Sequence, residues 1–176
     1  MTYYTAKDLA NSLRTVRSNT IRIAEDIPED KYDFRPAPDG RSVRELLTHI
    51  AWGHSFQKAV HQDERRTTLV GLDFPSLLKR AHEEEKRPRS KAEILELLRD
   101  NGHAWASFID AQDEAFLAER VDMPPGAQPA SKSRFEMLLS SKEHEMHHRA
   151  QLMLVERLIG IVPHLTRQMQ ERLAAR

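Results

Sequence analysis

Apolar residues recur at intervals of three and four along most of the chain, the spacing that places side chains on one face of an α-helix. The first stripe follows Thr5–Asp8, which can cap a helix, and ends before Pro28. Its positions are Leu9, Leu13, Val16, Thr20, Ile23 and Ile27. No sustained alternation of apolar and polar residues indicates a strand. The pattern therefore predicts a mainly helical protein.

Three Ser-x-x-Glu sequences mark further helix starts, because each serine and glutamate can satisfy the other's free backbone amide. They are Ser42–Glu45, Ser90–Glu93 and Ser133–Glu136. We expect the first of these helices to continue to Val60, the second to Phe116 and the third to end at Gly160. Shorter helices are expected over Phe74–Lys86 and His164–Arg176, and proline-rich loops over residues 28–41 and 121–130.

Length and composition limit the protein class. The 176 residues suit one domain spanning residues 1–176, and four substantial helices predict an all-α antiparallel four-helix bundle with additional short helices. Lys+Arg and Asp+Glu are 27 each, so no overall basic charge favours nucleic acid. Cysteine is absent, no apolar run is long enough to cross a membrane, and Met1–Tyr4 begins no secretory signal. We expect a cytoplasmic protein.

Histidines supply the candidate chemistry. His144 and His148 are four residues apart, so on a helix they lie one above the other and can bind one metal ion. His49 lies on the apolar stripe of an earlier helix and could be the third ligand. Such a set leaves a coordination position for water or substrate, and Zn²⁺, Ni²⁺ and Fe²⁺ all accept imidazole. A hydrogen-bonded core histidine is the alternative interpretation of His49.

The remaining histidines have no such pairing. We expect His54, His61, His82, His103 and His164 to be surface or loop residues. His147 points about a third of a turn away from the pair, and its role is left open.

The same residues also match H-E-x-x-H, a zinc-peptidase motif in which Glu145 would be the general base. The longer metzincin motif is broken, because Gln151 stands in place of its glycine and Leu154 in place of its histidine. No strand is predicted that could hold a peptide substrate. We therefore interpret Glu145 as a solvated carboxylate on the helix surface and keep the peptidase as the weakest alternative.

Two segments resemble the DinB/YfiT-like superfamily of four-helix-bundle metal proteins. Ile27–Pro38 followed by Arg41–Ala51 is similar to the family's stretch that ends in a histidine of the second helix. His144–Gln151 is similar to the family's His-x-x-His-His-Arg-Gly-Gln, with Ala150 in place of glycine. The resemblance covers most of the chain and implies a divalent-metal site made of His49, His144 and His148.

The resemblance also implies functional expectations. The metal would be zinc or nickel, with iron or manganese as further options, and the protein would form a homodimer. The reaction would be a metal-dependent hydrolysis or an S-transfer with a low-molecular-weight thiol, acting on a small molecule and not on nucleic acid or membrane. Glu145, His147 and Gln151 could orient a ligand or carry a proton. A non-catalytic metal-binding module for the stress response is the alternative.

Overall fold

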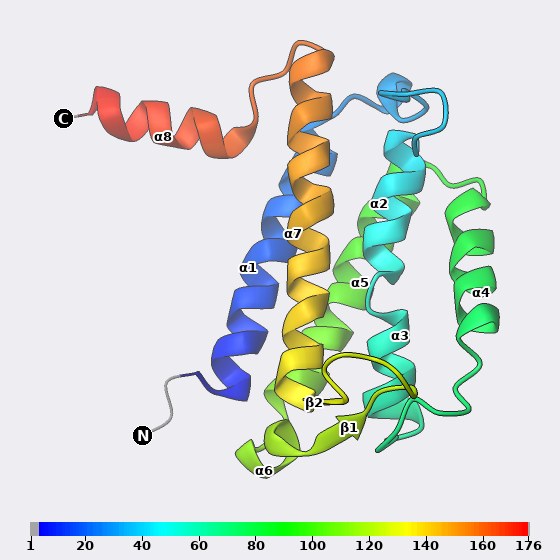
Figure 1. Cartoon of the computed structure of the whole chain (residues 1–176). Helices are drawn as coiled ribbons and strands as arrows, with labels where there is room; N and C mark the ends of the chain where they lie inside the picture. Colours follow the sequence, from blue (N-terminus) through cyan, green and yellow to red (C-terminus); the bar gives the residue numbers. More distant parts are fainter. Residues whose placement is uncertain (1–3, 176) are drawn as a thin grey trace.

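Four helical segments lie side by side in the computed structural model, which describes residues 4–175 (Figure 1). They are α1 (Ala6–Asp26), α2 (Val43–Trp52) continued by α3 (Ser55–Lys58), α5 (Lys91–Asp110) and α7 (Arg134–Leu158). Figure 1 shows α1 and α7 running in one direction and α2 and α5 in the other, so each helix has an antiparallel neighbour. The predicted all-α four-helix bundle is confirmed.

Shorter elements surround the bundle. A 3₁₀ turn (Glu29–Lys31) lies between α1 and α2, α4 (Phe74–Lys86) packs against α2, and α8 (His164–Ala174) projects away from α7 (Figure 1). Before the loop expected over residues 121–130 lies a short helix, α6 (Glu114–Ala118). The two ends of that loop join a small antiparallel pair, β1 (Arg120–Asp122) with β2 (Ser131–Ser133). The expectations for the first residues of the chain and for Arg176 fall outside the described residues.

The predicted helix starts are confirmed. Ser42, Ser90 and Ser133 each accept a hydrogen bond from the backbone amide of the glutamate three residues later, and each glutamate accepts one from the serine amide. Thr5 and Asp8 form the same capping box at α1, and Asp73 caps α4. Local hydrogen bonding therefore determines where these helices begin.

One helix ends earlier than predicted, and another is interrupted. α5 stops at Asp110, and Phe116 belongs to α6. The helix expected to run from Ser42 to Val60 breaks after Trp52, resumes as α3 and continues as a π-helical turn over Ala59–Asp63. At the break, a Cβ on Gly53 would lie 2.9 Å from Nδ1 of His144, so only glycine permits this close approach of α2 and α7.

The core is divided along the bundle axis. Besides a small cluster of Val60, Val121 and Met137, the described residues form two large apolar clusters. One joins Ile23, Leu47, Ile50, Leu98 and Leu152 with their neighbours, and the other is built around Leu9, Trp105, Ile109, Phe116 and Leu138. Buried polar side chains, including Arg17, Thr20 and Glu145, occupy the level between them. These residues lie next to the histidines considered below.

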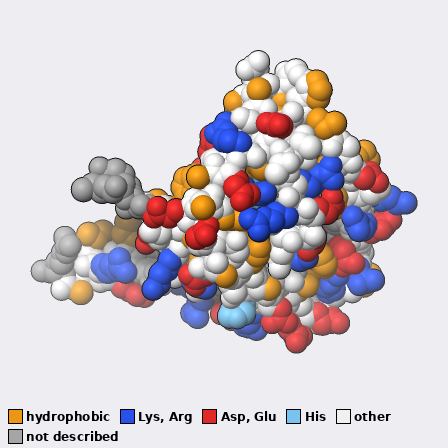
Figure 2. All heavy atoms as spheres, turned by 90° about the horizontal axis from the view of Figure 1, so that it is seen from below, with side chains coloured by type: hydrophobic (Ala, Val, Ile, Leu, Met, Phe, Trp, Pro, Cys, Tyr) orange, Lys and Arg blue, Asp and Glu red, His pale blue; other side chains and the backbone are white. Residues whose placement is uncertain are grey.

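The surface carries charges of both signs. On the bundle end that holds β1 and β2, basic and acidic side chains are interspersed (Figure 2). None of the helices within residues 4–175 has the length and hydrophobicity needed to cross a bilayer. On α8, Met169 and Leu173 are exposed.

Candidate metal centre

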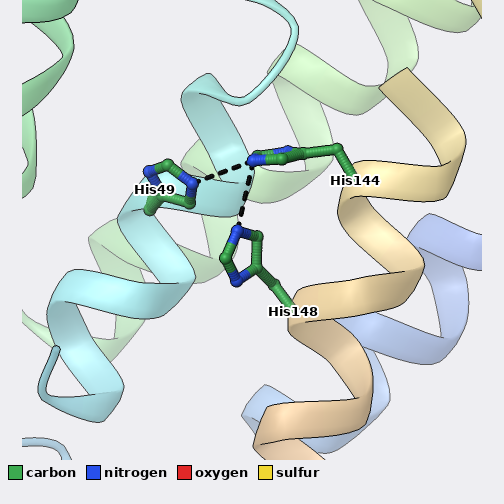
Figure 3. A group of neighbouring side chains, drawn as sticks. All are labelled: His49, His144 and His148. Carbon is green, nitrogen blue, oxygen red and sulfur yellow. Dashed lines mark hydrogen bonds between the residues drawn. The ribbon is translucent and has the colours of Figure 1, made fainter. Parts of the chain in front are cut away.

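His49 from α2 and His144 and His148 from α7 point toward one another (Figure 3). Nε2 of His144 lies 3.0 Å from Nε2 of His49 and 3.1 Å from Nε2 of His148. One ring nitrogen from each residue lies within 4.8 Å of the other two. The arrangement arises because the i, i+4 spacing stacks two imidazoles on α7, while α2 runs antiparallel beside them and presents the third.

The outer nitrogen of His49 faces a carboxylate. Its Nδ1 lies 2.6 Å from Oε1 of Glu85, which comes from α4 and is almost fully buried. Arg41 donates from Nε to the other oxygen of Glu85 at 2.7 Å. Burial raises the pKa of Glu85, but the hydrogen bonds from His49 and Arg41 outweigh it and lower that pKa to about 2. Glu85 is therefore ionised and accepts the Nδ1 proton, which leaves the Nε2 lone pair of His49 directed at the other histidines.

His148 has a similar outer partner on its own helix. Its Nδ1 lies 2.8 Å from Oε1 of Gln151, and Nε2 of Gln151 lies 3.2 Å from Nε2 of the exposed His147. A proton on Nδ1 of His148 again leaves its Nε2 lone pair facing inward. Gln151 thus orients His148, and His147 lies outside the three-histidine cluster.

Electrostatics favour neutral imidazoles at His144 and His148. Burial, reinforced by the neighbouring histidines, lowers the pKa of His144 to about 4, and burial does the same for His148. Nε2 of His144 lies at hydrogen-bond distance from Nε2 of both His49 and His148. Because those two atoms present lone pairs, a single proton on His144 cannot satisfy both contacts fully. The same atoms suit one divalent cation, so the residues present fit a metal ion.

The cluster opens onto a groove of about 710 Å³, lined by His148, Gln151 and Glu85 on the side of the histidines. Leu46, Leu154 and Val155 give it an apolar wall. Its charged lining is mixed, with the basic groups Arg35, Arg41 and Lys86 and the acidic groups Asp39, Glu45 and Glu85. This volume suits a small molecule.

Glu145 is not the solvated carboxylate that we expected. Only 4% of its surface is exposed, and it pairs with Arg17 at 2.9 Å and with Thr20 at 2.8 Å, both on α1. A peptidase general base must face the metal-bound substrate, whereas both oxygens of this carboxylate accept hydrogen bonds within a buried ion pair. The geometry therefore argues against the peptidase hypothesis.

Three of the histidines expected at the surface are buried. His54 stacks on Trp105, His61 bonds Gln57 and Arg134, and His164 lies 3.2 Å from the amide oxygen of Asn19. Apart from the local His61–Gln57 contact, these contacts join residues of different helices or turns that are distant in sequence, so helix periodicity could not reveal them. His82 and His103 are exposed, as predicted. Ala150 is also exposed, so its methyl group crowds no neighbouring helix.

Known proteins share this fold. The structure of YfiT from Bacillus subtilis, described as a probable metal-dependent hydrolase with an unusual four-helix bundle topology, is similar with a TM-score of 0.69 and 15% identity, over 92% of this chain and 91% of YfiT. A DinB-like protein, YjoA from Bacillus subtilis, has a TM-score of 0.62 and 19% identity, over 86% of this chain and 91% of YjoA.

A third similar structure is the colibactin self-resistance protein ClbS in complex with a double-stranded DNA. Its TM-score is 0.58 with 15% identity, over 87% of this chain and 98% of ClbS. That complex weakens the expectation, drawn from the sequence, that this chain has no nucleic-acid partner. No curated protein matches the sequence. A family model for the DinB superfamily matches residues 12–152, and the chain therefore belongs to the DinB superfamily.

Proposed function

We propose that the protein is a metal-dependent enzyme that binds one divalent cation through His49, His144 and His148 and transforms a small molecule in the adjoining groove. The observation that carries this proposal is the convergence of three imidazole nitrogens within 4.8 Å. Glu85 and Gln151 support it, because they fix two of the three lone pairs toward the common centre. The similarity to YfiT agrees with this assignment.

The chain's own residues would divide the work. His144 and His148 are held as neutral imidazoles, Glu85 orients His49, Gln151 orients His148, and the groove would admit the substrate beside His148. A divalent ion bound there supplies Lewis-acid activation of a water or thiol and polarises an electrophilic group. Imidazole ligands suit zinc, nickel and iron alike. The family resemblance favours zinc or nickel as the metal, and a hydrolysis or an S-transfer with a low-molecular-weight thiol as the reaction.

The substrate class follows from the groove. Its apolar wall and mixed charged lining suit a small organic molecule, and Leu154, 58% exposed, offers a contact surface at its edge. A cytoplasmic location and a homodimer stay predictions of the sequence. Light scattering tests the dimer, for which a mass of about twice 20.4 kDa is expected.

The test is turnover by zinc-loaded and nickel-loaded protein on panels of esters, amides and electrophiles with a thiol. His148→Ala is the inactive comparison and His103→Ala, on the exposed face of α5, is the matched control. Loss of turnover in His148→Ala alone supports the enzyme. Equal turnover in both variants contradicts it, and metal binding without turnover on any panel favours the non-catalytic module. A parallel titration with duplex DNA would show salt-sensitive binding if the chain shared the ligand of ClbS.

A further inference from the structure

A single buried guanidinium contacts all four helices of the bundle. Arg17 belongs to α1 and donates to the carboxylate of Glu145 on α7 from Nε and Nη2, both at 2.9 Å. Its Nη1 donates to the backbone oxygen of Leu98 on α5 at 2.7 Å, and its Nη2 to that of Ile50 on α2 at 3.3 Å. Thr20 donates a further hydrogen bond to Glu145 at 2.8 Å.

This group lies in the polar level between the two apolar clusters. Arg17 is 9% exposed and Glu145 is 4% exposed, so bulk water has little access to their contacts. Breaking such a pair leaves an uncompensated buried charge, which is strongly unfavourable. The guanidinium is planar and its N–H donors have fixed relative directions. The hydrogen bonds of Arg17 therefore fix the positions of α2, α5 and α7 relative to one another.

The contacts of Arg17 fall beside the metal ligands in sequence and in space. Ile50 directly follows His49, and Glu145 directly follows His144. A cavity of about 10 Å³, room for about one water, is lined by both Arg17 and His144. Because neighbouring residues of a helix point about 100° apart, Glu145 drawn toward α1 turns His144 toward α2. The pair thus sets the rotation of α7 about its axis.

We propose that Arg17, through Glu145 and the carbonyl of Ile50, is a positioning residue that holds His49 and the two histidines of α7 in register for metal binding. The proposal rests on the proposed function, since it assumes that these histidines bind a cation. It gives a role to the glutamate of the H-E-x-x-H motif that involves no contact with substrate. The role is structural organisation of the ligands and is separate from a general contribution to packing.

Gly102 on α5 makes the arrangement possible and provides the test. A Cβ at this position would lie 2.7 Å from Cγ and 3.0 Å from Nη1 of Arg17. Those atoms are pinned by the hydrogen bonds described above, so alanine must displace the Arg17 side chain. Gly102 itself belongs to neither of the helices that carry the histidines. An effect of this substitution on metal binding would therefore be transmitted through Arg17.

The experiment measures Gly102→Ala against His103→Ala, the next residue on α5, which is exposed. Zinc Kd is determined by competition with a chromophoric chelator, and the visible spectrum of the cobalt-loaded protein reports ligand geometry. Displacement of an orienting partner typically weakens metal binding by about 10- to 100-fold, so we expect Kd to rise about tenfold and the cobalt bands to change. His103→Ala should match the wild type in both.

Thermal melting separates positioning from stability. Alanine is the better helix former, so a stability loss is not required for the effect, and all titrations are made well below the melting temperature. An unchanged Kd and cobalt spectrum in folded Gly102→Ala would overturn the proposal. Should that variant not fold, Arg17→Lys gives the same readout, because lysine keeps the charge beside Glu145 but cannot reach all three helices. If the wild type binds no metal, the proposed function fails instead.

Discussion

Glu85→Gln tests how the metal centre is organised, because it keeps the shape of the side chain and removes its charge. Glu85 lies 2.6 Å from Nδ1 of His49 and 2.7 Å from Nε of Arg41. Glutamine can still accept the His49 proton with one oxygen, but that hydrogen bond becomes neutral. The ion pair with Arg41 is lost.

The size of the effect follows from the two kinds of hydrogen bond. A hydrogen bond to a charged group contributes about 1.5–3 kcal/mol, and a neutral one about 0.5–1.5 kcal/mol. The Arg41 side chain is 40% exposed, so solvent screens much of the charge left uncompensated beside the cation. We predict a loss of about 1.4 kcal/mol in zinc binding, which is about a tenfold rise in Kd.

Competition with a chromophoric zinc chelator measures this change. Glu83→Gln is the matched control, because Glu83 is exposed on the same helix and its one ion pair, to Lys79, is 3.9 Å long. The control should bind zinc like the wild type. A Glu85→Gln protein that binds zinc within twofold of wild type would refute the inference that Glu85 fixes the lone pair of His49.

Three further outcomes are expected. Zinc at a hundred times its Kd should raise the free energy of unfolding by about 2.7 kcal/mol, and a chelator should reverse the gain in a thermal melt. Gly53→Ala should weaken zinc binding in the same competition assay, because the new Cβ would lie 2.9 Å from Nδ1 of His144; wild-type affinity would contradict the close approach. Burial, reinforced by Asp26, raises the pKa of Glu156 from 4.5 to about 7. The folded state then binds more protons than the unfolded state between these pH values, so stability falls as pH rises through that window. Glu156→Gln should abolish this fall and be more stable than wild type at pH 8 by up to about 3 kcal/mol in urea denaturation. If the stability of the variant and of the wild type changes with pH in the same way, Glu156 is not the group responsible.

Much of the fold could be predicted from local sequence. The capping boxes at Ser42, Ser90 and Ser133 are satisfied within three residues, so the sequence alone identifies where those helices begin. Helix ends were harder. Gly53 could be mistaken for a small residue inside a continuous helix, since its requirement comes from His144, which lies on another helix.

The candidate site was also predictable only where it depends on residues close together in sequence. The spacing of His144 and His148 is local, and their relation to His49 was inferred from helix faces and family resemblance. Glu85 was missed because its contact with His49 depends on how α4 packs outside the bundle, which no periodicity records. Glu145 was misinterpreted because its partner, Arg17, is 128 residues away.

The most direct test of the central claim is isothermal titration of the metal-free protein with zinc, with elemental analysis of the complex. We predict one zinc per chain for the wild type and for His103→Ala. We predict no comparable binding for His49→Ala or His144→Ala. Zinc binding that persists unchanged in both of these variants, or a folded wild-type protein that binds no divalent cation, would contradict a metal centre formed by His49, His144 and His148.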